Sequence, residues 1–499
     1  MINAESAEPR LPITLLASAD APGRPGEQLQ GKMGTLKLIL TVLAMSAPLG
    51  AVAGVMPLVI SEGNGAGAPA TYLVMGVILM LFAVGFTTMA RNFPRAGAFY
   101  AYITGGLGKP LGLSSAFLAQ LGYMTLLVGT YAFFGDQAEV LMTSLFGFSP
   151  VPWWGWGAAL FVAVTMLGHF NVELSGRVLS VMMVIEVCIV LIFNIPMLAT
   201  GGPQGWQVES FTPAAFTSGS IGLAILFASA TFLGFEGTAI YRNEVRNPDK
   251  TVPRATYLAI GFIAVFYVFS SWALVTFYGT DNVVAVAQEN PSTMFASGLS
   301  YFAGPVVAEI MTCLVVTSLF AATLSAHNPM ARYTFALARD GVYPAILGRV
   351  HGTHKSPAIA SAVTSALTLV IIVPFILAGV GAVTFYSWMF GLGTYALLLC
   401  MAMACLAVIV YFRRVTHTER RWNTIIAPAL GFVGLAVMLG ISSFYFPLLI
   451  GGDVVLAGIF QGSVFALIIL GIVLALVWRR TRPSVYSRIG GEEDTSTLA

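Results

Sequence analysis

The sequence has few charged residues and few residues that ligate metals or act as nucleophiles. Asp, Glu, Lys and Arg make up 9% of the 499 residues, against roughly 25% in a typical soluble domain. The chain has five histidines and four cysteines, and we expect the cysteines, which all fall in apolar stretches, to be small buried hydrophobic side chains. They are Cys188, Cys313, Cys400 and Cys405. We therefore expect no metal site, no cofactor and no enzymatic centre.

Two other functional classes have no support in the sequence. The net charge of +2 is too small to indicate nucleic-acid binding. The chain also lacks a glycine-rich loop of the phosphate-cradling type, which excludes ATP-driven pumping by this chain alone.

Long apolar runs account for most of the chain. Apolar residues make up 57% of it, and we predict twelve stretches long enough to cross a bilayer. Their approximate limits are 36–60, 70–90, 111–146, 152–168, 178–200, 219–241, 255–279, 301–330, 357–380, 382–412, 424–450 and 454–478. These stretches leave no room for a large soluble domain.

The basic residues lie in every second connection between these stretches. If the N-terminus is cytoplasmic, all 24 Lys and Arg fall on the cytoplasmic side, and the outer connections contain acids but no base. Cationic side chains are costly to translocate, so we predict a multi-pass protein of the cell membrane with both termini cytoplasmic. We expect residues 1–32 to form a disordered tail and residues 479–499 a solvated tail whose bases contact anionic lipid.

Two apolar stretches contain helix breakers at comparable depth. The first reads AMSAPLGAVAGVMP over 44–57, and the sixth reads LFASATFLGFEG over 226–237. Gly and Pro are common packing residues in membrane helices, but paired interruptions five helices apart indicate a transporter built from inverted repeats. An unwound segment in the bilayer requires a polar cavity beside it. Its free amides favour a carboxylate and its free carbonyls an ammonium group, so the pattern suits an amino acid.

Three segments carry a family resemblance. They read RNFPRAGAFYAYITGGLGKPLG over 91–112, GFEGTAIYRNEVRNPDKTVPRA over 234–255 and NPMARYTFALARDGVYP over 328–344. Over roughly residues 35–450 the chain resembles permeases of the amino acid/polyamine/organocation superfamily. The resemblance implies an all-α polytopic fold of the LeuT type, with a ten-helix core over 33–412 in two inverted repeats, 33–205 and 206–412. It also implies two peripheral helices within 422–478.

The resemblance further implies alternating-access transport of amino acids or related amines, and it suggests which residues line the substrate site. These are the backbones of Gly50, Ala51, Val52, Ala53 and Gly54 in the first stretch, and of Phe232, Leu233 and Gly234 in the sixth. Many relatives have Gly-Ser/Thr-Gly in the first break, so a substrate carboxylate would here meet backbone amides without a hydroxyl. Relatives often have a bulky aromatic residue where this chain has Ala230, so the gating role falls on Phe232 or Phe227, with Tyr123 as a further candidate.

Five acids lie within the apolar stretches, and each is a functional hypothesis because charge is costly there. They are Asp136, Glu139, Glu186, Glu236 and Glu309. We place Asp136, Glu139 and Glu309 near the outer ends of their helices, where solvation is the simpler interpretation. Glu236 matches the family acid of the sixth helix, with a plausible role in holding the broken backbone and tuning the inner gate. Glu186 follows Arg177 by nine residues, which puts it roughly 13 Å deep.

Glu186 is our main candidate for ion coupling. Proton-coupled relatives often have a lysine at the matching place. We hypothesise that a neutral Glu186 donates a hydrogen bond to carbonyls of the first helix and later releases its proton inward; a permanently neutral, hydrogen-bonded glutamic acid is the structural alternative. The leading interpretation is a secondary active transporter that couples uptake of an amino acid or amine to a proton. The alternatives are an amino acid/polyamine exchanger and a sodium-coupled symporter that uses hydroxyls of Thr317, Ser318, Thr323 or Ser325.

Overall fold

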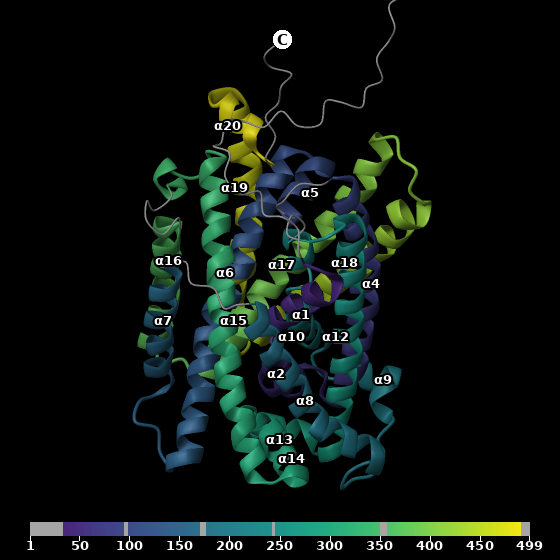
Figure 1. Cartoon of the computed structure of the whole chain (residues 1–499), viewed down its shortest axis with the longest axis vertical. Helices are drawn as coiled ribbons and strands as arrows, with labels where there is room; N and C mark the ends of the chain where they lie inside the picture. Colours follow the sequence, from purple (N-terminus) through teal and green to yellow (C-terminus); the bar gives the residue numbers. More distant parts are fainter. Residues whose placement is uncertain (1–32, 94–97, 170–175, 242–244, 350–356, 491–499) are drawn as a thin grey trace, which may run out of the picture.

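The computed structural model describes residues 33–93, 98–169, 176–241, 245–349 and 357–490, so the expected N-terminal tail lies outside the described residues. The described residues form an all-helical bundle whose long helices run side by side (Figure 1). The long helices are α4 (Ala68–Asn92), α6 (Lys109–Phe146), α7 (Trp153–His169), α8 (Gly176–Thr200), α12 (Pro248–Tyr278), α15 (Pro305–Arg339), α16 (Ala358–Leu377), α17 (Ala382–Arg414), α18 (Ala427–Leu449) and α19 (Val454–Thr481).

All twelve expected apolar stretches are helical in the structure, and two of them, the first and the sixth, consist of several short helices. Ten helical segments of the described chain are long and apolar enough to cross a membrane. The number is lower than twelve for two reasons. The segment Pro48–Asn92 joins the second half of the first stretch to the whole of the second, and α7, with 17 residues, is at the lower limit of the length that crosses a bilayer.

Short helices that the apolar pattern did not predict lie at the two ends of the bundle. They are α5 (Ala98–Leu107), α9 (Pro213–Phe216), α13 (Val283–Glu289), α14 (Met294–Ala303) and α20 (Pro483–Arg488). The helices α5 and α20 share one end, and α13 and α14 lie at the other (Figure 1). The N–H of Arg246 donates to the carbonyl of Met33 at 2.9 Å, which ties the start of the described chain to the loop before α12.

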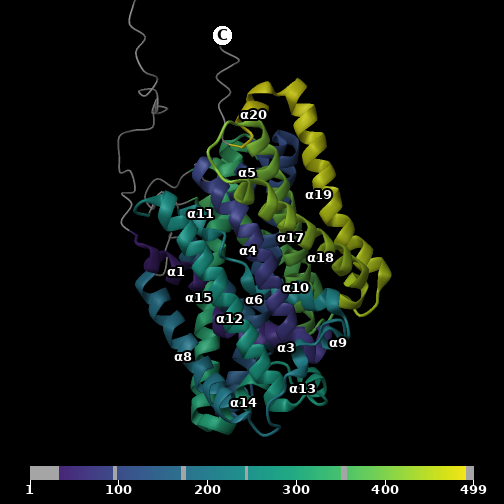
Figure 2. The ribbon, with the colours of Figure 1, turned by 90° about the vertical axis from the view of Figure 1, so that its right-hand side faces the viewer.

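The core lies along α6 and α17, and α19 runs along the outer edge of the bundle (Figure 2). Phe133 and Tyr386 are almost fully buried there, with ring centroids 4.9 Å apart. Cys400 and Cys405 of α17 are buried as expected, whereas Cys188 and Cys313 are exposed on helix surfaces, so the expectation of burial was wrong for these two. Their helices present one face outward, and apolar periodicity did not show which face.

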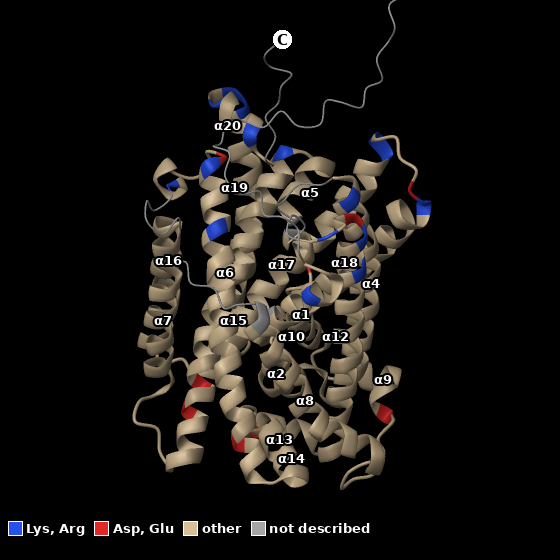
Figure 3. Ribbon diagram, in the orientation of Figure 1, with Lys and Arg blue, Asp and Glu red and all other residues tan. Residues whose placement is uncertain are grey.

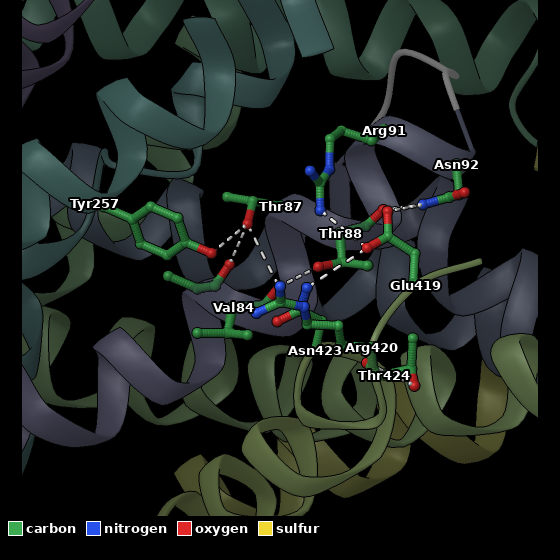
Figure 4. Close-up of polar contacts among 11 residues, drawn as sticks. Val84, Thr87, Thr88, Arg91, Asn92, Tyr257, Glu419, Arg420, Asn423 and Thr424 are labelled. Carbon is green, nitrogen blue, oxygen red and sulfur yellow. Dashed lines mark hydrogen bonds and ion pairs between the residues drawn. The ribbon is translucent and has the colours of Figure 1, made fainter. Parts of the chain in front are cut away.

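Lysines and arginines gather toward the end that carries α20, and the opposite end shows only acids in the view of Figure 3. At the basic end, Arg91 of α4 forms an ion pair with Glu419, whose Oε2 lies 3.3 Å from its Nη2. Glu419 also accepts a hydrogen bond from Asn92 at 3.2 Å (Figure 4). These contacts tie α4 to the connection between α17 and α18.

The C-terminal segment differs from the expected solvated tail. The helix α19 extends to Thr481, α20 follows it, and the side chain of Ile489 is fully buried. That expectation was therefore wrong for Val485, Ile489 and Gly490, which are buried, whereas residues 479–484 are exposed as expected and residues 491–499 lie outside the described part. The sequence of this segment has few apolar residues and therefore did not predict that it packs against the bundle. The packing depends on a few side chains such as Val485 and Ile489.

Candidate functional site

The first apolar stretch is broken at Ser46 and Ala47. The helix α1 (Thr35–Met45) ends there, and α2 (Pro48–Gly50) begins after it. Ala47 has φ 43° and ψ 69°, a left-handed conformation that is rare for residues other than glycine. Pro48 explains the position, because proline disfavours right-handed helix at the residue before it and has no N–H to continue the ladder.

The stretch is helical again after this break. It continues as the π-helix η1 (Ala51–Val55), then α3 (Met56–Leu58) and the π-helix η2 (Val59–Asn64). The interruption expected within 44–57 is therefore at Ser46 and Ala47, and the glycine-rich run 50–54, which was expected to belong to it, is helical. A π-helix has a wider turn than an α-helix and often occurs at functional sites.

The sixth stretch is broken at Leu233 and Gly234, as expected. The helix α10 (Ile221–Phe232) ends at Phe232, and α11 (Gly237–Ile240) resumes the path. Leu233 is extended, with ψ 144°, and Gly234 has φ 113°. That value is in a region that essentially only glycine adopts without strain, so the glycine fixes the position of the break.

The two breaks meet. The hydroxyl of Ser46 donates to the carbonyl of Thr231 at 2.9 Å and lies 3.4 Å from the hydroxyl of Tyr267. Thr231 is in the last turn of α10, where carbonyls have no partner within the helix. We call the place where these groups meet the junction; it is formed by residues 46–49, the end of α10 and the side chains that contact them.

Glu186 of α8 lies at the junction. Its Oε2 accepts a hydrogen bond from the N–H of Leu49 at 3.3 Å, and its side chain is 4% exposed. Leu49 is in the first turn of α2, where free amides and the helix dipole favour a negative charge. Ser318 of α15 lies against the same carboxyl group. Glu186 thus occupies the kind of helix N-terminus that the sequence suggested for a substrate carboxylate.

Glu236 holds the second break from within. Its Oε2 accepts from the N–H of Gly234 at 2.9 Å, and its Oε1 accepts from the hydroxyl of Tyr123 at 2.8 Å. The side chain is 2% exposed. The carboxyl group therefore satisfies a backbone amide freed by the break and connects it to α6.

The two aromatic gating candidates of α10, Phe232 and Phe227, are both fully buried. The ring of Phe232 lies edge-on to Tyr267, with centroids 6.1 Å apart, and 6.5 Å from the ring of Tyr72. Because Tyr267 also contacts Ser46, Phe232 belongs to the wall of the junction. Phe227 lies more than one turn earlier in α10.

The glycines of the run 50–54 have different surroundings. All five residues of the run are buried. A Cβ at Gly54 would lie 1.9 Å from Cζ of Phe133, whereas at Gly50 the nearest atom would be 3.6 Å away. The carbonyl of Gly54 also accepts from the hydroxyl of Tyr386 at 3.1 Å. Gly54 therefore allows α6 and α17 to pack closely on the first stretch.

The other acids and hydroxyls are distributed between this site and the far end of the bundle. Gln137 donates to Asp136 at 3.1 Å and to the carbonyl of Ser292 between α13 and α14, which places Asp136 away from the junction. Thr317 and Thr323 donate to carbonyls of their own helix. Of these two and Ser318, only Ser318 reaches Glu186 in the described structure.

Sequence reasoning missed three junction residues: Leu49, Thr231 and Tyr267. The signal for Leu49 was available, because the residue after Pro48 supplies the first free amide of a helix that begins at proline. Thr231 contributes a backbone carbonyl and Tyr267 a hydroxyl from a distant helix. Neither contribution depends on a local sequence pattern.

Similarity to known proteins agrees with this architecture. The chain is 24% identical to the branched-chain amino acid permease BcaP of Bacillus subtilis, covering 64% of this chain and 70% of that protein. It is 26% identical to the aromatic amino acid transport protein AroP of Escherichia coli over 69% of this chain and 75% of the relative. It is 21% identical to the low-affinity putrescine importer PlaP of Escherichia coli over 61% and 66%.

The family model for amino acid permeases matches residues 39–484, which include both breaks, Glu186 and all the long helices from α4 onward. The match covers most of the described bundle, and the helices long enough to span a membrane lie within it. This multi-pass membrane transporter, which is not an enzyme, belongs to the amino acid permease family within the amino acid/polyamine/organocation superfamily.

Proposed function

We propose that the protein is a secondary active transporter that moves an amino acid or a related amine across the cell membrane by alternating access. The observation that carries the proposal is the meeting of two broken helices at the Ser46–Thr231 hydrogen bond. Non-helical backbone at membrane depth is tolerated where it lines a polar site. In this proposal twelve crossings form two inverted repeats, 33–205 and 206–412, with α18 and α19 outside them.

The substrate binds at the junction. Carbonyls at the end of α10 accept hydrogen bonds from its ammonium group, and backbone amides of the first stretch approach its carboxylate when it has one. The proposed lining is the backbone of residues 50–54 and 232–234 together with Ser46. The proposal of an amino acid or amine substrate is supported by relatives whose names specify branched-chain amino acids, aromatic amino acids or putrescine.

The coupled ion is a proton carried by Glu186. The carboxyl group is buried, contacts the α2 half-helix through Leu49 and has no cationic partner among the described residues. The negative charge of Glu186 interacts favourably with the N-terminus of α2, and proton binding removes that charge. The protonation state of Glu186 and the position of the α2 half-helix are therefore coupled. Glu236 is the second candidate, because it links the other break to Tyr123.

The test is uptake by purified protein in proteoliposomes under an imposed pH gradient. We expect the wild type to concentrate its substrate, and Glu186→Gln to bind and exchange substrate across the membrane without concentrating it. Glu139→Gln, which removes an acid near the far end of α6, is the matched control and should accumulate normally. Concentrative, pH-driven uptake by Glu186→Gln would overturn the role of Glu186.

A sodium gradient imposed at equal pH separates the two ions. Accumulation driven by sodium and lost in Ser318→Ala would replace the proton proposal with sodium coupling. Transport by neither gradient, with intact exchange of internal for external substrate, would make the protein an exchanger.

A further inference from the structure

A cavity of about 660 Å³ lies at the end of α15, between its last turn, the loop that follows and the C-terminal helix α20. Its charged lining residues are three arginines, Arg339, Arg482 and Arg488, and no acid lines it. We call it the arginine cavity. It is at the end of the bundle where basic residues gather, around α20 (Figure 3).

The wall formed by the C-terminal segment is held in place by specific contacts. The N–H of Gly490 donates to the hydroxyl of Tyr100 at 2.6 Å, and Nζ of Lys109 donates to the carbonyl of Ser487 at 3.0 Å. The fully buried side chain of Ile489 adds an apolar anchor. Arg488 lies within this anchored segment and Arg482 directly precedes α20, so both are kept at the cavity.

The third arginine belongs to a separate element that Arg488 contacts closely. Arg339 ends α15, and the turn after it passes through Gly341, which has φ +84°. A Cβ at Gly341 would lie 2.9 Å from Nη2 of Arg488, so this glycine allows the guanidinium group to pack on the backbone of the turn. The cavity thus brings Arg339, at the end of α15, together with Arg482 and Arg488 of the C-terminal segment.

An acid adjoins the cavity but forms no ion pair with these arginines. Asp340 accepts a hydrogen bond from Tyr100 at 3.2 Å, and Arg488 and Arg339 interact with its carboxyl group only from beyond ion-pair distance. Among the described residues, none of the three arginines has a carboxylate within 4.0 Å. Three neighbouring guanidinium groups without a paired anion make a strongly positive cavity.

We propose that the arginine cavity binds a phosphate-bearing anion, from an anionic phospholipid headgroup or from free phosphate. Guanidinium groups match phosphate oxygens with paired hydrogen bonds. The candidate spans Pro305–Arg339 and Val454–Thr481 end beside the cavity, which puts it at headgroup level. A bound anion joins α20 to α15, the helix that also carries Ser318.

The experiment compares three forms of the full-length protein, purified in uncharged detergent. Arg339→Gln/Arg482→Gln removes two charges from the cavity but leaves the anchoring contacts of Lys109, Ile489 and Gly490. Arg479→Gln/Arg480→Gln is the matched control. It also removes two positive charges, but these are at the end of α19 and do not line the cavity. Binding of phosphatidylglycerol, net-neutral phosphatidylcholine and inorganic phosphate is measured by native mass spectrometry and by thermal stability.

We expect saturable binding of phosphatidylglycerol or of inorganic phosphate by the wild type and the control, and binding about tenfold weaker by the cavity variant. Preference for phosphatidylglycerol identifies a lipid site, and equal competition by inorganic phosphate identifies a free-phosphate site. Equal losses in both variants, or no difference from phosphatidylcholine, would overturn the proposal, because attraction would then be non-specific.

A rival occupant is the chain itself, since Glu492, Glu493 and Asp494 follow Gly490 closely in the sequence. The variant Glu492→Gln/Glu493→Gln/Asp494→Asn tests it. We expect its affinity for the phosphate probe to equal that of the wild type. Binding that appears only in this variant would show that carboxylates of the chain occupy the cavity, and would overturn the proposal.

Discussion

At the scale of single residues, the same residue type has different roles within a few positions of the first stretch. Gly50 and Gly54 both belong to the run that resembles a substrate-binding break, yet only Gly54 is in a place where any side chain would collide with its neighbour. Ala47, which has a side chain, is the residue in the left-handed conformation. Glycine here serves close packing, and proline determines where the backbone turns.

Gly54→Ala should destabilise the protein by about 1–3 kcal/mol, because its Cβ forces the ring of Phe133 to move within a filled core. Gly50→Ala is the matched control, since its Cβ would make ordinary contacts at 3.6 Å. Thermal unfolding in detergent measures both. A compensating Phe133→Leu change should recover part of the loss in Gly54→Ala; equal stability of the two single variants would contradict the packing role.

At the scale of elements, each half-helix end at the junction has its own partner. Glu186 accepts from the amide of Leu49 at the start of α2, and Ser46 donates to a carbonyl near the end of α10. Glu236 satisfies the amide of Gly234 within the second break. The polar groups at the breaks thus have partners within the protein, and a substrate that binds at the proposed site would replace or join these hydrogen bonds.

The two breaks could be predicted from sequence, the first only to within residues 44–57. Pro48 and Gly234 are local signals that act on the neighbouring backbone, and both breaks lie beside them. Residues 50–54 are helical, and Gly54 among them provides room for Phe133 and accepts a hydrogen bond from Tyr386, side chains that come from helices far along the chain. The arginine cavity was missed because its walls meet only in the folded protein.

Pro48→Ala should raise the stability of the protein by about 1 kcal/mol and lower its transport activity. The change restores a backbone N–H and removes the constraint that favours the left-handed conformation of Ala47, so α1 and α2 can join with less strain. Pro57→Ala in α3 is the control, because the residues before it are already right-handed. Uptake and thermal stability are measured together; unchanged uptake by Pro48→Ala would show that the break is not needed for transport.

At the scale of the whole molecule, the charge distribution and the helix order depend on each other. The alternation of basic connections predicted one basic end, and the described lysines and arginines do gather toward the end with α5 and α20 (Figure 3). Pairing between elements adds to this arrangement, as in the Arg91–Glu419 contact that joins α4 to the connection before α18 (Figure 4). Because that pair is partly exposed, we expect it to contribute only about 0.5 kcal/mol.

The orientation predicted from this charge distribution can be tested with single cysteines in a background that lacks the four native ones. Thr418→Cys is in the exposed basic connection between α17 and α18, and Asn282→Cys is exposed beside α13 at the opposite end. Because basic segments remain on the cytoplasmic side, a membrane-impermeant thiol reagent should modify Asn282→Cys in intact cells and Thr418→Cys only after permeabilisation. The reverse result would show that the bundle has the opposite orientation in the membrane. The proton proposed for Glu186 would then be released to the outside, and the arginine cavity would face the outer leaflet.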